Sequence, residues 1–566
     1  MEKRQFLESL LDKLSLEEKI AQMMVLGQTG TVVDPLLTAF IRRYGLGGLR
    51  VTPNGGRKFV RYLKEGSKGM EHVSRAPQWG EKMVDTTIPS HFLTAEAYAD
   101  FLNSFRTIAF ERRSLGIPLH MVADCEAGGG NCAVPYLISM PHAMGFGDLG
   151  DLDLLERAWT ATARQVKALG VDWLHSPVVD VNVNPRNPEI STRSFGADPA
   201  VVSACAAANL RGLKAANVIG CLKHYPGRGD SANDAHFGLP VVNASRQAMH
   251  DIHLKPYRDL IAAGQVESVM LAHTVFPALD PDAEIATVSE YLTRELLRGE
   301  LGFQGVITTD SMTMGGLMDR YSVSEAAIRA IRNGVDLILL KDDNALRFEL
   351  HRDLVAAVRS GRIKEEEVDR SILRVWSLKY DHGLFADGGV VAPEAAEDLM
   401  RRDEFRAIGR EMSEKVCRIV RLEKGVLPLR PEQKILVIDR VTDAQCQRND
   451  YWNYPAMFHD FLRRFSDNIM YCDYSGRNAD NALAIAQRFA AECDVIVLTS
   501  DYDRAAAQAV DRQVAEKLAR LGKPLIQISA NPYRELVVPD SVKNVIVTYG
   551  LMHEQLEAVS RKLFGK

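Results

Sequence analysis

The sequence predicts an α/β protein in two parts, an N-terminal (β/α)8 barrel of the TIM type followed by a smaller α/β domain. The first 385 residues alternate eight short apolar runs with helical segments, a pattern typical of parallel α/β folds. Polar residues gather where these runs end, as they do on the active face of a barrel. After a stretch rich in Gly, Ala and acidic residues, a second and shorter set of apolar runs begins.

Eight apolar runs are the predicted barrel strands. Amphipathic segments such as 156–170 lie between most of them, and eight strand–helix units in this length fit a (β/α)8 barrel. An open doubly wound sheet, which also collects polar groups at its strand ends, is the alternative. The runs occupy residues 23–28, 46–52, 119–126, 172–181, 218–226, 268–276, 305–312 and 335–343.

Two further segments belong to this first part. Leucines recur at helical spacing between positions 7 and 14, which predicts an amphipathic helix, and Ser15 is placed to cap the next helix. Residues 52–95 form a charged insertion with few periodic apolar positions. We expect it to be an elaborated loop or small subdomain near the barrel rim, or else a solvated excursion from the surface.

The pattern breaks near residues 383–393, and we place a linker at 386–402. This divides the chain into a barrel domain of residues 1–385 and a C-terminal domain of residues 403–566. Helical stretches alternate with the apolar runs of the C-terminal part, which is typical of a three-layer α/β domain. Those runs occupy residues 434–439, 494–500, 524–529 and 544–550.

Composition narrows the class of protein. A net charge of −5 gives no electrostatic basis for binding nucleic acid or an acidic membrane surface. No window reaches the length of a membrane span, and the N-terminus lacks the apolar stretch of a signal peptide. The eight cysteines show no zinc-ligand spacing, so we expect reduced thiols, no metal, no cofactor and a cytoplasmic location. The oligomeric state is left open.

The most informative segment is 223–240, which reads KHYPGRGDSANDAHFGLP. A predicted strand ends at Lys223 and His224, and the Pro- and Gly-broken residues after it predict a loop. A loop so dense in charge and glycine at the end of a strand is suited to contact a polar ligand and to move. On composition alone, an ordinary turn with helix-capping Asp and Asn explains it equally well.

This segment resembles the KHFPGHGD…DSH…LP signature of family-3 glycoside hydrolases, in particular their N-acetylglucosaminidase branch. The resemblance runs in order from about residue 15 to about residue 345, and it implies a TIM barrel. The segment KVCRIVRLEKGVLPL resembles the entry to the C-terminal α/β sandwich of many two-domain members. Other segments that carry the resemblance are LSLEEKIAQMMVLG, MPHAMGFG, SPVVDVNVNPRNPEISTRSFGADP, SVMLAHTVFPALD, VITTDSMTMGGL and AIRNGVDLILL.

The resemblance implies three catalytic residues. Asp310 in TTDSM matches the nucleophile, which forms a covalent glycosyl-enzyme that water then hydrolyses with retention of configuration. His236 matches the acid/base and Asp234 its partner, since a neighbouring carboxylate orients a histidine and favours its protonated form. Without the motif, Asp310 would be read as a helix N-cap and His236 as a surface residue.

The implied sugar-binding residues are charged or polar groups that can grip vicinal hydroxyls. For Arg193 there is an alternative to sugar binding, in which it anchors its own loop by pairing with Asp198. Lys223 ends an apolar strand and would otherwise be a buried, unpaired charge. The full set is Asp124, Arg193, Lys223 and His224, with Asp180, His273 and Arg228 as further candidates.

Two positions depart from the branch pattern. Where the branch usually reads DQEGGR, this chain reads DCEAGGGN from Asp124, so the Arg is missing and the sugar is less well defined. Arg228 replaces a second His, which adds a fixed positive charge near the acid/base and would favour an anionic substrate group or acceptor.

We therefore predict a metal-independent retaining hydrolase that releases terminal β-linked N-acetylglucosamine from a small saccharide. The alternatives are phosphorolysis of the same substrates, in which Arg228 would help to bind phosphate, and a β-glucosidase or β-xylosidase of the same family. A different class is a catalytically weak sugar-binding relative, which the three intact catalytic residues disfavour. A nucleotide or electron-transfer enzyme is disfavoured because no complete phosphate-binding glycine motif follows a strand.

Overall fold

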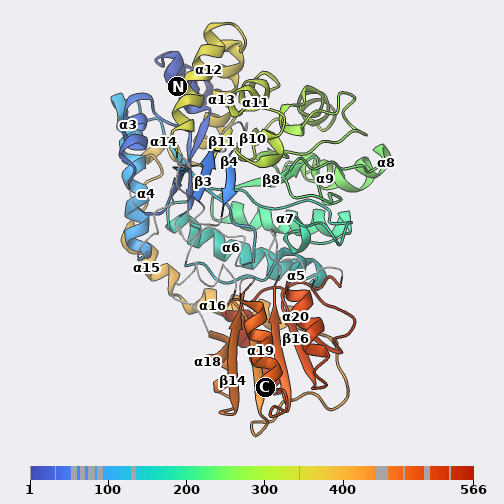
Figure 1. Cartoon of the computed structure of the whole chain (residues 1–566). Coiled ribbons are helices and arrows are strands. Elements are labelled where there is room, and N and C mark those ends of the chain that lie inside the picture. Colours follow the sequence, from blue (N-terminus) through green and yellow to red (C-terminus); the bar gives the residue numbers. More distant parts are fainter. Residues whose placement is uncertain are drawn as a thin grey trace.

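The structure, a computed structural model, contains an eight-stranded barrel and a six-stranded sheet (Figure 1). Three short strands within residues 60–85 are described by their backbone alone. The other described residues are 2–31, 33–52, 94–128, 136–236, 238–342, 344–441, 457–475, 478–501, 510–534 and 537–566.

The first part is a closed parallel barrel, which confirms the predicted fold class and excludes the open doubly wound sheet. Its sheet runs in the order β10-β9-β8-β7-β6-β2-β1-β11. A parallel bridge between Thr308 and Leu337 then joins the two outer strands β10 and β11. The strands are β1 (Met24–Thr29), β2 (Gly48–Thr52), β6 (His120–Ala123), β7 (Trp173–Leu174), β8 (Ile219–Tyr225), β9 (Ser268–Leu271), β10 (Val306–Thr309) and β11 (Ile338–Leu340).

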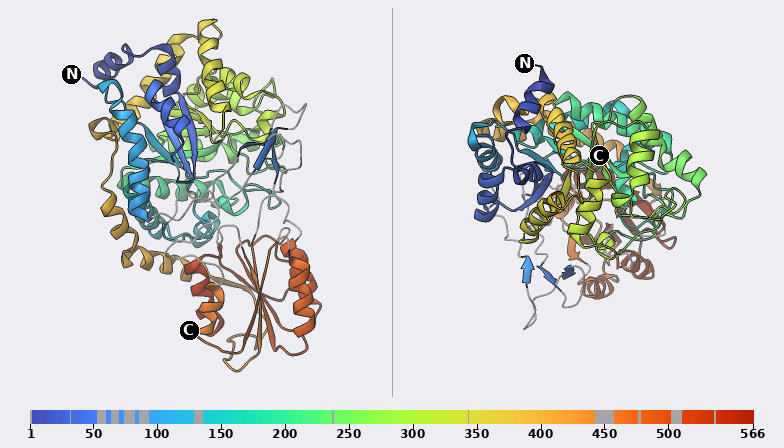
Figure 2. Two further views of the ribbon diagram at one scale, coloured as in Figure 1. Left: turned by 60° about the vertical axis from the view of Figure 1, so that its left-hand side comes forward. Right: turned by 90° about the horizontal axis from the view of Figure 1, so that it is seen from above.

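Helices surround this barrel and follow most of its strands (Figure 2). Two stretches are π-helical: Met249–His253, which directly follows α8, and Tyr291–Glu300. The α-helices are α1 (Lys3–Leu11), α2 (Leu16–Gln22), α3 (Pro35–Tyr44), α4 (Ala95–Phe110), α5 (Ala143–Leu149), α6 (Leu152–Ala168), α7 (Pro199–Ala215), α8 (Arg246–Ala248), α9 (Lys255–Ala262), α10 (Gly315–Met318), α11 (Val323–Arg332), α12 (Leu346–Arg359), α13 (Glu365–Asp381) and α14 (Leu384–Asp387).

The N-terminal helices form as the sequence predicts. Helix α1 buries Leu7, Leu10 and Leu11. Ser15 caps α2 in a reciprocal capping box with Glu18, which satisfies two backbone N–H groups at the start of the helix.

The interior of the barrel is packed with apolar side chains from most of its strands, including Val25, Val122 and Trp173. Helix α13 reaches this interior with Val375, so it closes the end opposite the carboxyl ends of the strands. The barrel is thus a packed core, and its chemistry is confined to the carboxyl-end face.

The predicted insertion contributes a small antiparallel sheet, β4-β3-β5 (Met70–Val73, Val60–Leu63 and Met83–Asp85). The rest of residues 53–93 lies outside the described residues, so their predicted place at the rim stays a prediction.

The second part is a three-layer α/β sandwich, as the sequence predicts. Its sheet runs β12-β17-β16-β15-β13-β14, with β12 antiparallel and the others parallel. Apolar clusters pack α19 and α20 on one face and α18 and α21 on the other (Figure 2). The elements are β12 (Arg418–Arg421), β13 (Ile435–Arg440), α18 (Met457–Arg463), β14 (Ile469–Tyr474), α19 (Ala479–Phe489), β15 (Val495–Ser500), α20 (Val510–Ala519), β16 (Leu525–Ser529), β17 (Asn544–Val547) and α21 (His553–Leu563).

The segment predicted as a linker contains regular structure. Helix α15 (Pro393–Met400) buries Ala396 and Met400, and Glu397 accepts a hydrogen bond from the backbone N–H of Ala95 at the start of α4. Helix α16 (Asp403–Val416) then leads into β12. The domain limits 1–385 and 403–566 stay a prediction.

The loops after β16 and β17 contact the barrel. The Asn531 side chain donates to Ser191 Oγ at 2.9 Å, and Asn182 Nδ2 donates to the Tyr533 hydroxyl at 2.9 Å. The backbone N–H of His142 donates to the Tyr549 carbonyl at 2.6 Å. Asn182 and Ser191 lie in the long loop after β7, so the second sheet points its strand ends at the carboxyl-end face of the barrel.

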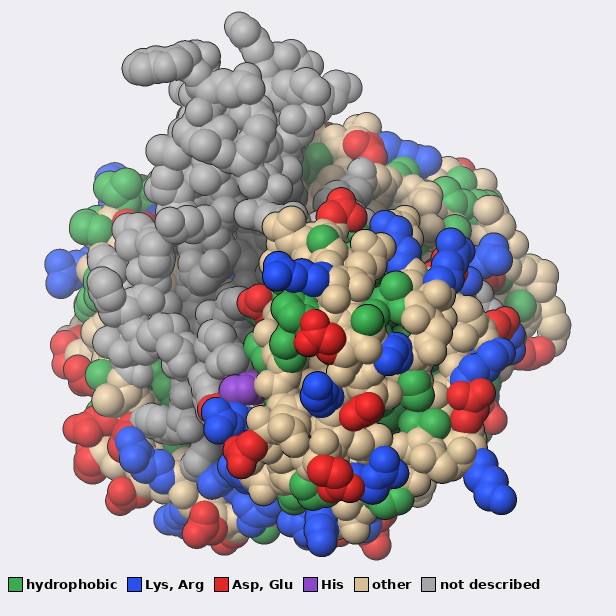
Figure 3. Space-filling model, turned by 60° about the horizontal axis from the view of Figure 1, so that its bottom comes forward, with side chains coloured by type: hydrophobic (Ala, Val, Ile, Leu, Met, Phe, Trp, Pro, Cys, Tyr) green, Lys and Arg blue, Asp and Glu red, His purple; other side chains and the backbone are tan. Residues whose placement is uncertain are grey.

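The described cysteines carry free thiols, and Cys125, Cys205, Cys221, Cys417 and Cys493 are buried. Cys132 and Cys446 lie outside the described residues. Among the described helices, none combines the length and the apolar character that crossing a membrane requires. On the face shown in Figure 3, side chains of both charge signs are interspersed over the described surface.

Candidate active site

The residues predicted to carry chemistry meet at the carboxyl ends of strands β6 to β10. Asp124 follows β6, Asp180 follows the β7 segment, and His273 follows β9. Lys223 and His224 lie within β8, and Arg228, Asp234 and His236 lie in the loop after it. Asp310 follows β10 directly, and Arg193 lies in a 3₁₀ turn of the β7 loop.

Asp310 is a partly exposed carboxylate surrounded by positive charge. Its Oδ1 accepts the backbone N–H of Ser311 at 2.7 Å, and its side chain is 16% exposed. Its Oδ2 lies 3.7 Å from Arg228 Nη2 and 3.9 Å from His224 Nε2. Burial alone would raise the pKa of Asp310, but His273, Arg228, the Ser311 N–H and Lys341 outweigh it and hold the pKa below its usual value. The group is therefore an ionised carboxylate at neutral pH.

Asp180 lies behind this site and organises it. Its Oδ2 accepts from His224 Nδ1 at 2.7 Å, and its Oδ1 accepts the backbone N–H of Arg228 at 2.7 Å. The side chain is fully buried. Burial raises the pKa of Asp180 to about 6, against the opposing charge of Arg228. Asp180 thus orients His224 and the start of the acid/base loop.

His273 is also buried and engaged by protein groups. Its Nδ1 lies 2.7 Å from the Thr287 hydroxyl, and its Nε2 lies 2.9 Å from the Ser311 carbonyl, to which it donates. Burial lowers the pKa of His273. The residue therefore fixes the backbone that follows Asp310.

A second group of charges surrounds Glu126. Arg193 donates to it with two nitrogens, Nε at 2.6 Å and Nη2 at 2.8 Å, and the Lys223 ammonium forms an ion pair with it. Lys223 Nζ is also 3.6 Å from Asp124 Oδ1. Lys223 is thus paired, which is why a buried lysine is tolerated at the end of β8. The alternative pairing of Arg193 with Asp198 is wrong, because Asp198 caps α7 through the backbone N–H of Ala200.

Asp124 is the more open carboxylate, with 34% of its side chain exposed. Arg50 Nη2 donates to its Oδ2 at 2.6 Å, and His175 Nδ1 lies 3.2 Å from its Oδ1. Burial would raise the pKa of Asp124, but Arg50, Lys223 and His175 hold it well below its usual range. Asp124 is therefore an ionised acceptor at the open side of the site.

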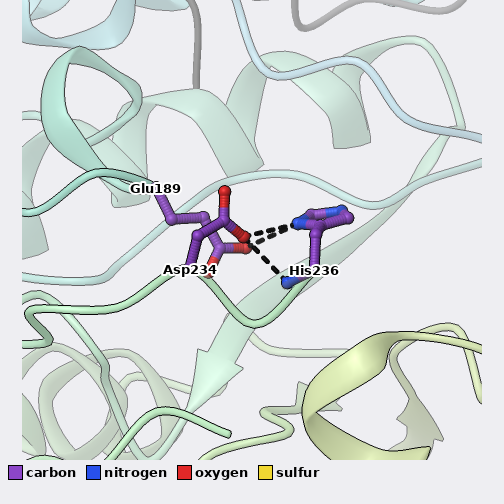
Figure 4. Close-up of side chains that lie close together, drawn as sticks. All are labelled: Glu189, Asp234 and His236. Carbon is purple, nitrogen blue, oxygen red and sulfur yellow. Dashed lines mark hydrogen bonds and ion pairs between the residues drawn. The ribbon is translucent and has the colours of Figure 1, made fainter. Parts of the chain in front are cut away.

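The acid/base candidates lie together on the loop after β8 (Figure 4). His236 Nδ1 lies 2.7 Å from Asp234 Oδ1, which also accepts the backbone N–H of His236 at 2.9 Å. A third side chain, Glu189 from the β7 loop, places Oε1 3.6 Å from His236 Nδ1. His236 is 24% exposed, whereas both carboxylates are buried.

The same three residues offer donor atoms within 4.8 Å of one another, a spacing that a metal ion would accept. Arg228 Nη2 lies 2.7 Å from Glu189 Oε1, however, and this fixed positive charge opposes a cation there. We assign no metal to the cluster.

Three residues of this site escaped the sequence analysis: Glu189, Arg50 and His175. Glu126 ends the apolar run 119–126, where polar residues were expected to gather. Arg50 had a signal, since it is a charged residue inside an apolar strand. Glu189 had none, because its contacts join two loops about 40 positions apart in the chain, and no spacing rule applies to such pairs.

Comparisons of the sequence and the structure with known proteins agree on one family. The model of the glycosyl hydrolase family 3 N-terminal domain matches residues 15–378. A β-N-acetylglucosaminidase/β-glucosidase of Cellulomonas fimi is 34% identical over 344 residues, which is 59% of this chain and 60% of that protein. β-Hexosaminidase A of Pseudoalteromonas piscicida is 32% identical over 298 residues, 49% of this chain and 50% of that protein. The chain thus matches only about half to three fifths of these relatives' length.

Solved structures match over the whole chain. A family 3 β-N-acetylglucosaminidase from Paenibacillus sp. str. FPU-7 has a TM-score of 0.80 at 26% identity, covering 98% of this chain and 97% of that one. The β-glucoside phosphorylase BglX has a TM-score of 0.79 at 22% identity, covering 100% and 95%, and this likeness shows the fold alone.

Proposed function

Since the chain belongs to glycosyl hydrolase family 3, we propose that it is a retaining glycosidase that releases terminal β-linked N-acetylglucosamine from small saccharides. The observation that carries the proposal is that the ionised carboxylate of Asp310 and the hydrogen-bonded His236–Asp234 pair follow the carboxyl ends of two strands of one barrel, β10 and β8. Relatives that bear β-N-acetylglucosaminidase and β-hexosaminidase names support the choice of sugar.

In the first step, an Asp310 oxygen attacks the anomeric carbon and the bond to the leaving oxygen breaks. His236 gives its proton to that oxygen, so an alcohol leaves and a glycosyl ester of Asp310 remains. Because Nδ1 faces Asp234, Nε2 is the nitrogen that delivers the proton. Asp234 stabilises the protonated imidazole before the transfer and fixes its orientation.

In the second step, the neutral His236 takes a proton from water as the water oxygen attacks the anomeric carbon. The ester bond to Asp310 breaks and the carboxylate is regenerated. Two displacements at the same carbon retain its configuration.

The remaining polar groups hold the sugar. We assign hydroxyl contacts to Asp124, Arg193, Lys223 and His224. Arg193, Lys223 and Asp124 are linked by charge pairs through Glu126 and Lys223, and His224 lies 3.9 Å from Asp310. Asp180 and His273 are proposed to act from behind, by orienting His224 and the Ser311 backbone. We place the reaction in the barrel unit, residues 1–385, and the buried free thiols favour the cytoplasm.

The charge pairing of Arg228 helps to choose between hydrolysis and phosphorolysis. Its guanidinium pairs with Glu189 at 2.7 Å, so its charge is offset within the protein. This favours hydrolysis over transfer to phosphate, because the proposed phosphate ligand already has an anionic partner.

The test compares release of p-nitrophenol from the β-N-acetylglucosaminide and the β-glucoside, with and without phosphate. We expect preference for the N-acetyl sugar, no stimulation by phosphate, and a fall in kcat on the order of 10³ or more for Asp310→Asn. A fluorinated slow substrate should label the peptide that holds Asp310.

The matched control is Asp319→Asn, an exposed aspartate nine positions further along, which should keep full activity. Stimulation by phosphate would replace hydrolysis with phosphorolysis. Failure of folded wild type to cleave either sugar would leave a sugar-binding protein.

A further inference from the structure

We propose that Glu189 is a positioning residue. It holds the loop after β8, which carries His236 and is called the acid/base loop here, against the loop after β7, which carries Arg193, and it offsets the charges of His236 and Arg228. The proposal rests on the roles assigned above to His236 and Asp310. Glu189 touches neither reacting atom in that scheme, and it acts through the side chains and backbone around it.

Glu189 fixes the backbone of the acid/base loop. Its Oε2 accepts the N–H of Ala235, the residue between Asp234 and His236, at 3.1 Å. Glu189 is only 2% exposed, so water does not replace this bond easily.

The segment that carries Glu189 is itself held in place. Asn187 Oδ1 accepts the backbone N–H groups of Glu189 and Ile190 at 3.0 and 2.9 Å. Asn187 Nδ2 in turn donates to the Arg228 carbonyl at 2.9 Å. The two loops are therefore joined at both ends of the 228–236 segment.

Glu189 also stands in a row of alternating charges. Its Oε1 lies 3.6 Å from His236 Nδ1 and 2.7 Å from Arg228 Nη2. Arg228 Nη2 then lies 3.7 Å from Asp310 Oδ2. The order is imidazole, carboxylate, guanidinium, carboxylate, so Glu189 lies between His236 and Arg228, and Arg228 lies between two carboxylates.

Other charged groups face the members of this row. Asp234 faces His236 at 2.7 Å, and Arg193 Nη1 lies 3.9 Å from Glu189. Around Asp310 lie His224, His273 and Lys341. Glu189 is the one described carboxylate that contacts both His236 and Arg228, which makes it the link between the acid/base and the nucleophile.

The row suits the proposed reaction. When the glycosyl-enzyme forms, His236 loses its proton and Asp310 loses its charge in the same step. Glu189 and Arg228 then still neutralise each other, so neither is left as an unpaired buried charge. The pair thus favours an ionised nucleophile and a protonated acid before the step, and stays balanced after it.

The test is Glu189→Gln, because glutamine keeps an oxygen for the Ala235 N–H and removes the charge. We expect the basic limb of the kcat/KM profile to move to lower pH by about one unit. We expect kcat to fall several-fold with KM changed little, since the proposed contacts with substrate hydroxyls are assigned to other residues. In Glu189→Ala, kcat should fall further. In Glu189→Asp, the basic limb of the kcat/KM profile should return to its wild-type pH.

A double variant separates charge balance from folding. Glu189→Gln leaves the buried Arg228 with only the longer contact to Asp310, at 3.7 Å, whereas Glu189→Gln with Arg228→Met removes both charges. The double variant should fold, and its basic limb should lie between those of wild type and Glu189→Gln. Its acid limb should move to higher pH, because Asp310 has lost the Arg228 charge.

An activity-independent readout keeps the outcome distinct from failure of the proposed function. Selectively ¹³C-labelled histidine reports the titration of His236 by NMR, assigned with His236→Asn. A lower midpoint in Glu189→Gln supports the positioning role even if the sugar is misassigned. An unchanged midpoint and unchanged kcat in folded Glu189→Gln overturn it. Glu156→Gln, in an exposed pair with Arg211, is the control and should change neither.

Discussion

At the residue scale, the site depends on charge pairs whose partners come from different loops. Arg193 and Lys223 both meet Glu126, and Asp124 is held by Arg50 and His175. Such pairs are buried or half-buried, where a lost partner costs more than it does at the surface.

Arg193→Lys tests the bidentate contact with Glu126. Lysine keeps the charge but offers a single ammonium in place of the planar fork, so Glu126 and the sugar-binding face lose their fixed geometry. We expect KM for the N-acetylglucosaminide to rise about 10-fold or more, which corresponds to roughly 1.5–3 kcal/mol for a charged hydrogen bond. Arg211→Lys, an exposed pair on α7, should leave KM unchanged.

Asp310 predicts the acidic side of the pH profile. Neighbouring positive groups hold the pKa of Asp310 below its usual value. The carboxylate therefore stays ionised down to that lowered pKa, and activity is lost only below it. The acid limb of kcat/KM should therefore lie below the ordinary aspartate value of about 3.9, measured at short times after a pH jump. An acid limb near pH 5 would contradict this.

At the scale of elements, helix α13 places a buried lysine at the end of the barrel opposite the carboxyl ends of the strands. Lys379 is buried, and its ammonium donates to the carbonyls of Gly47 at 2.6 Å and Pro118 at 2.9 Å. Burial lowers the pKa of Lys379 to about 7, although Asp172 acts in the opposite sense.

The sign of the resulting pH dependence follows from proton binding. The unfolded lysine, with a pKa of about 10.4, holds a proton that the folded one releases above about 7, so stability rises with pH across this window. Below pH 7 both states are protonated and the folded state bears the cost of a buried ammonium.

Lys379→Met removes this contribution. We expect the free energy of unfolding to rise less between pH 7 and 10 than in wild type, with a difference in slope of about 1.4 kcal/mol per pH unit at most. Denaturant titrations at pH 7, 8.5 and 10 measure it, and Lys214→Met, an exposed lysine on α7, should keep the wild-type slope.

The elements were largely predictable because apolar runs mark buried strands. Seven of the eight barrel strands lie within their predicted ranges, and β1 extends one residue beyond its range, to Thr29; Ser15 caps α2 as predicted. The run 172–181 shows the limit: only Trp173–Leu174 pairs as a strand, and the residues after it turn to build the site, with Val178 bridging Lys223. The local sequence pattern indicates which residues are buried. It does not indicate which loops contact each other, and for this reason the position of Glu189 in the site was missed.

At the scale of the whole molecule, the second sheet supports the loop that holds Glu189 and Arg193. Asn531 reaches Ser191 and Tyr533 reaches Asn182, each at 2.9 Å. Thr192, next to Arg193, lies 3.0 Å from His142 Nδ1, and the backbone of His142 is bound to Tyr549. Three contacts thus converge on the loop after β7.

Asn531→Ala combined with Tyr533→Phe tests this support. Both removed groups are hydrogen-bonded at the contact between the two parts, so the loop after β7 should lose its fixed position. We expect KM to rise by up to about 30-fold, the factor that corresponds to two lost bonds at about 1 kcal/mol each, with the melting temperature of the barrel changed little. Arg534→Ala, an exposed neighbour paired with Asp540, is the control. An unchanged KM would show that the loop holds itself.

Barrel closure has a consequence for the chain as it leaves the ribosome. Strand β1 pairs with β11, so Met24 meets Ile338 across more than 300 residues of sequence. At about 5–20 residues per second, β1 waits roughly 15–60 s for its last partner. During that interval a nascent apolar strand presents an open edge, which is the feature that chaperones recognise and that crowded ribosomes bring into contact.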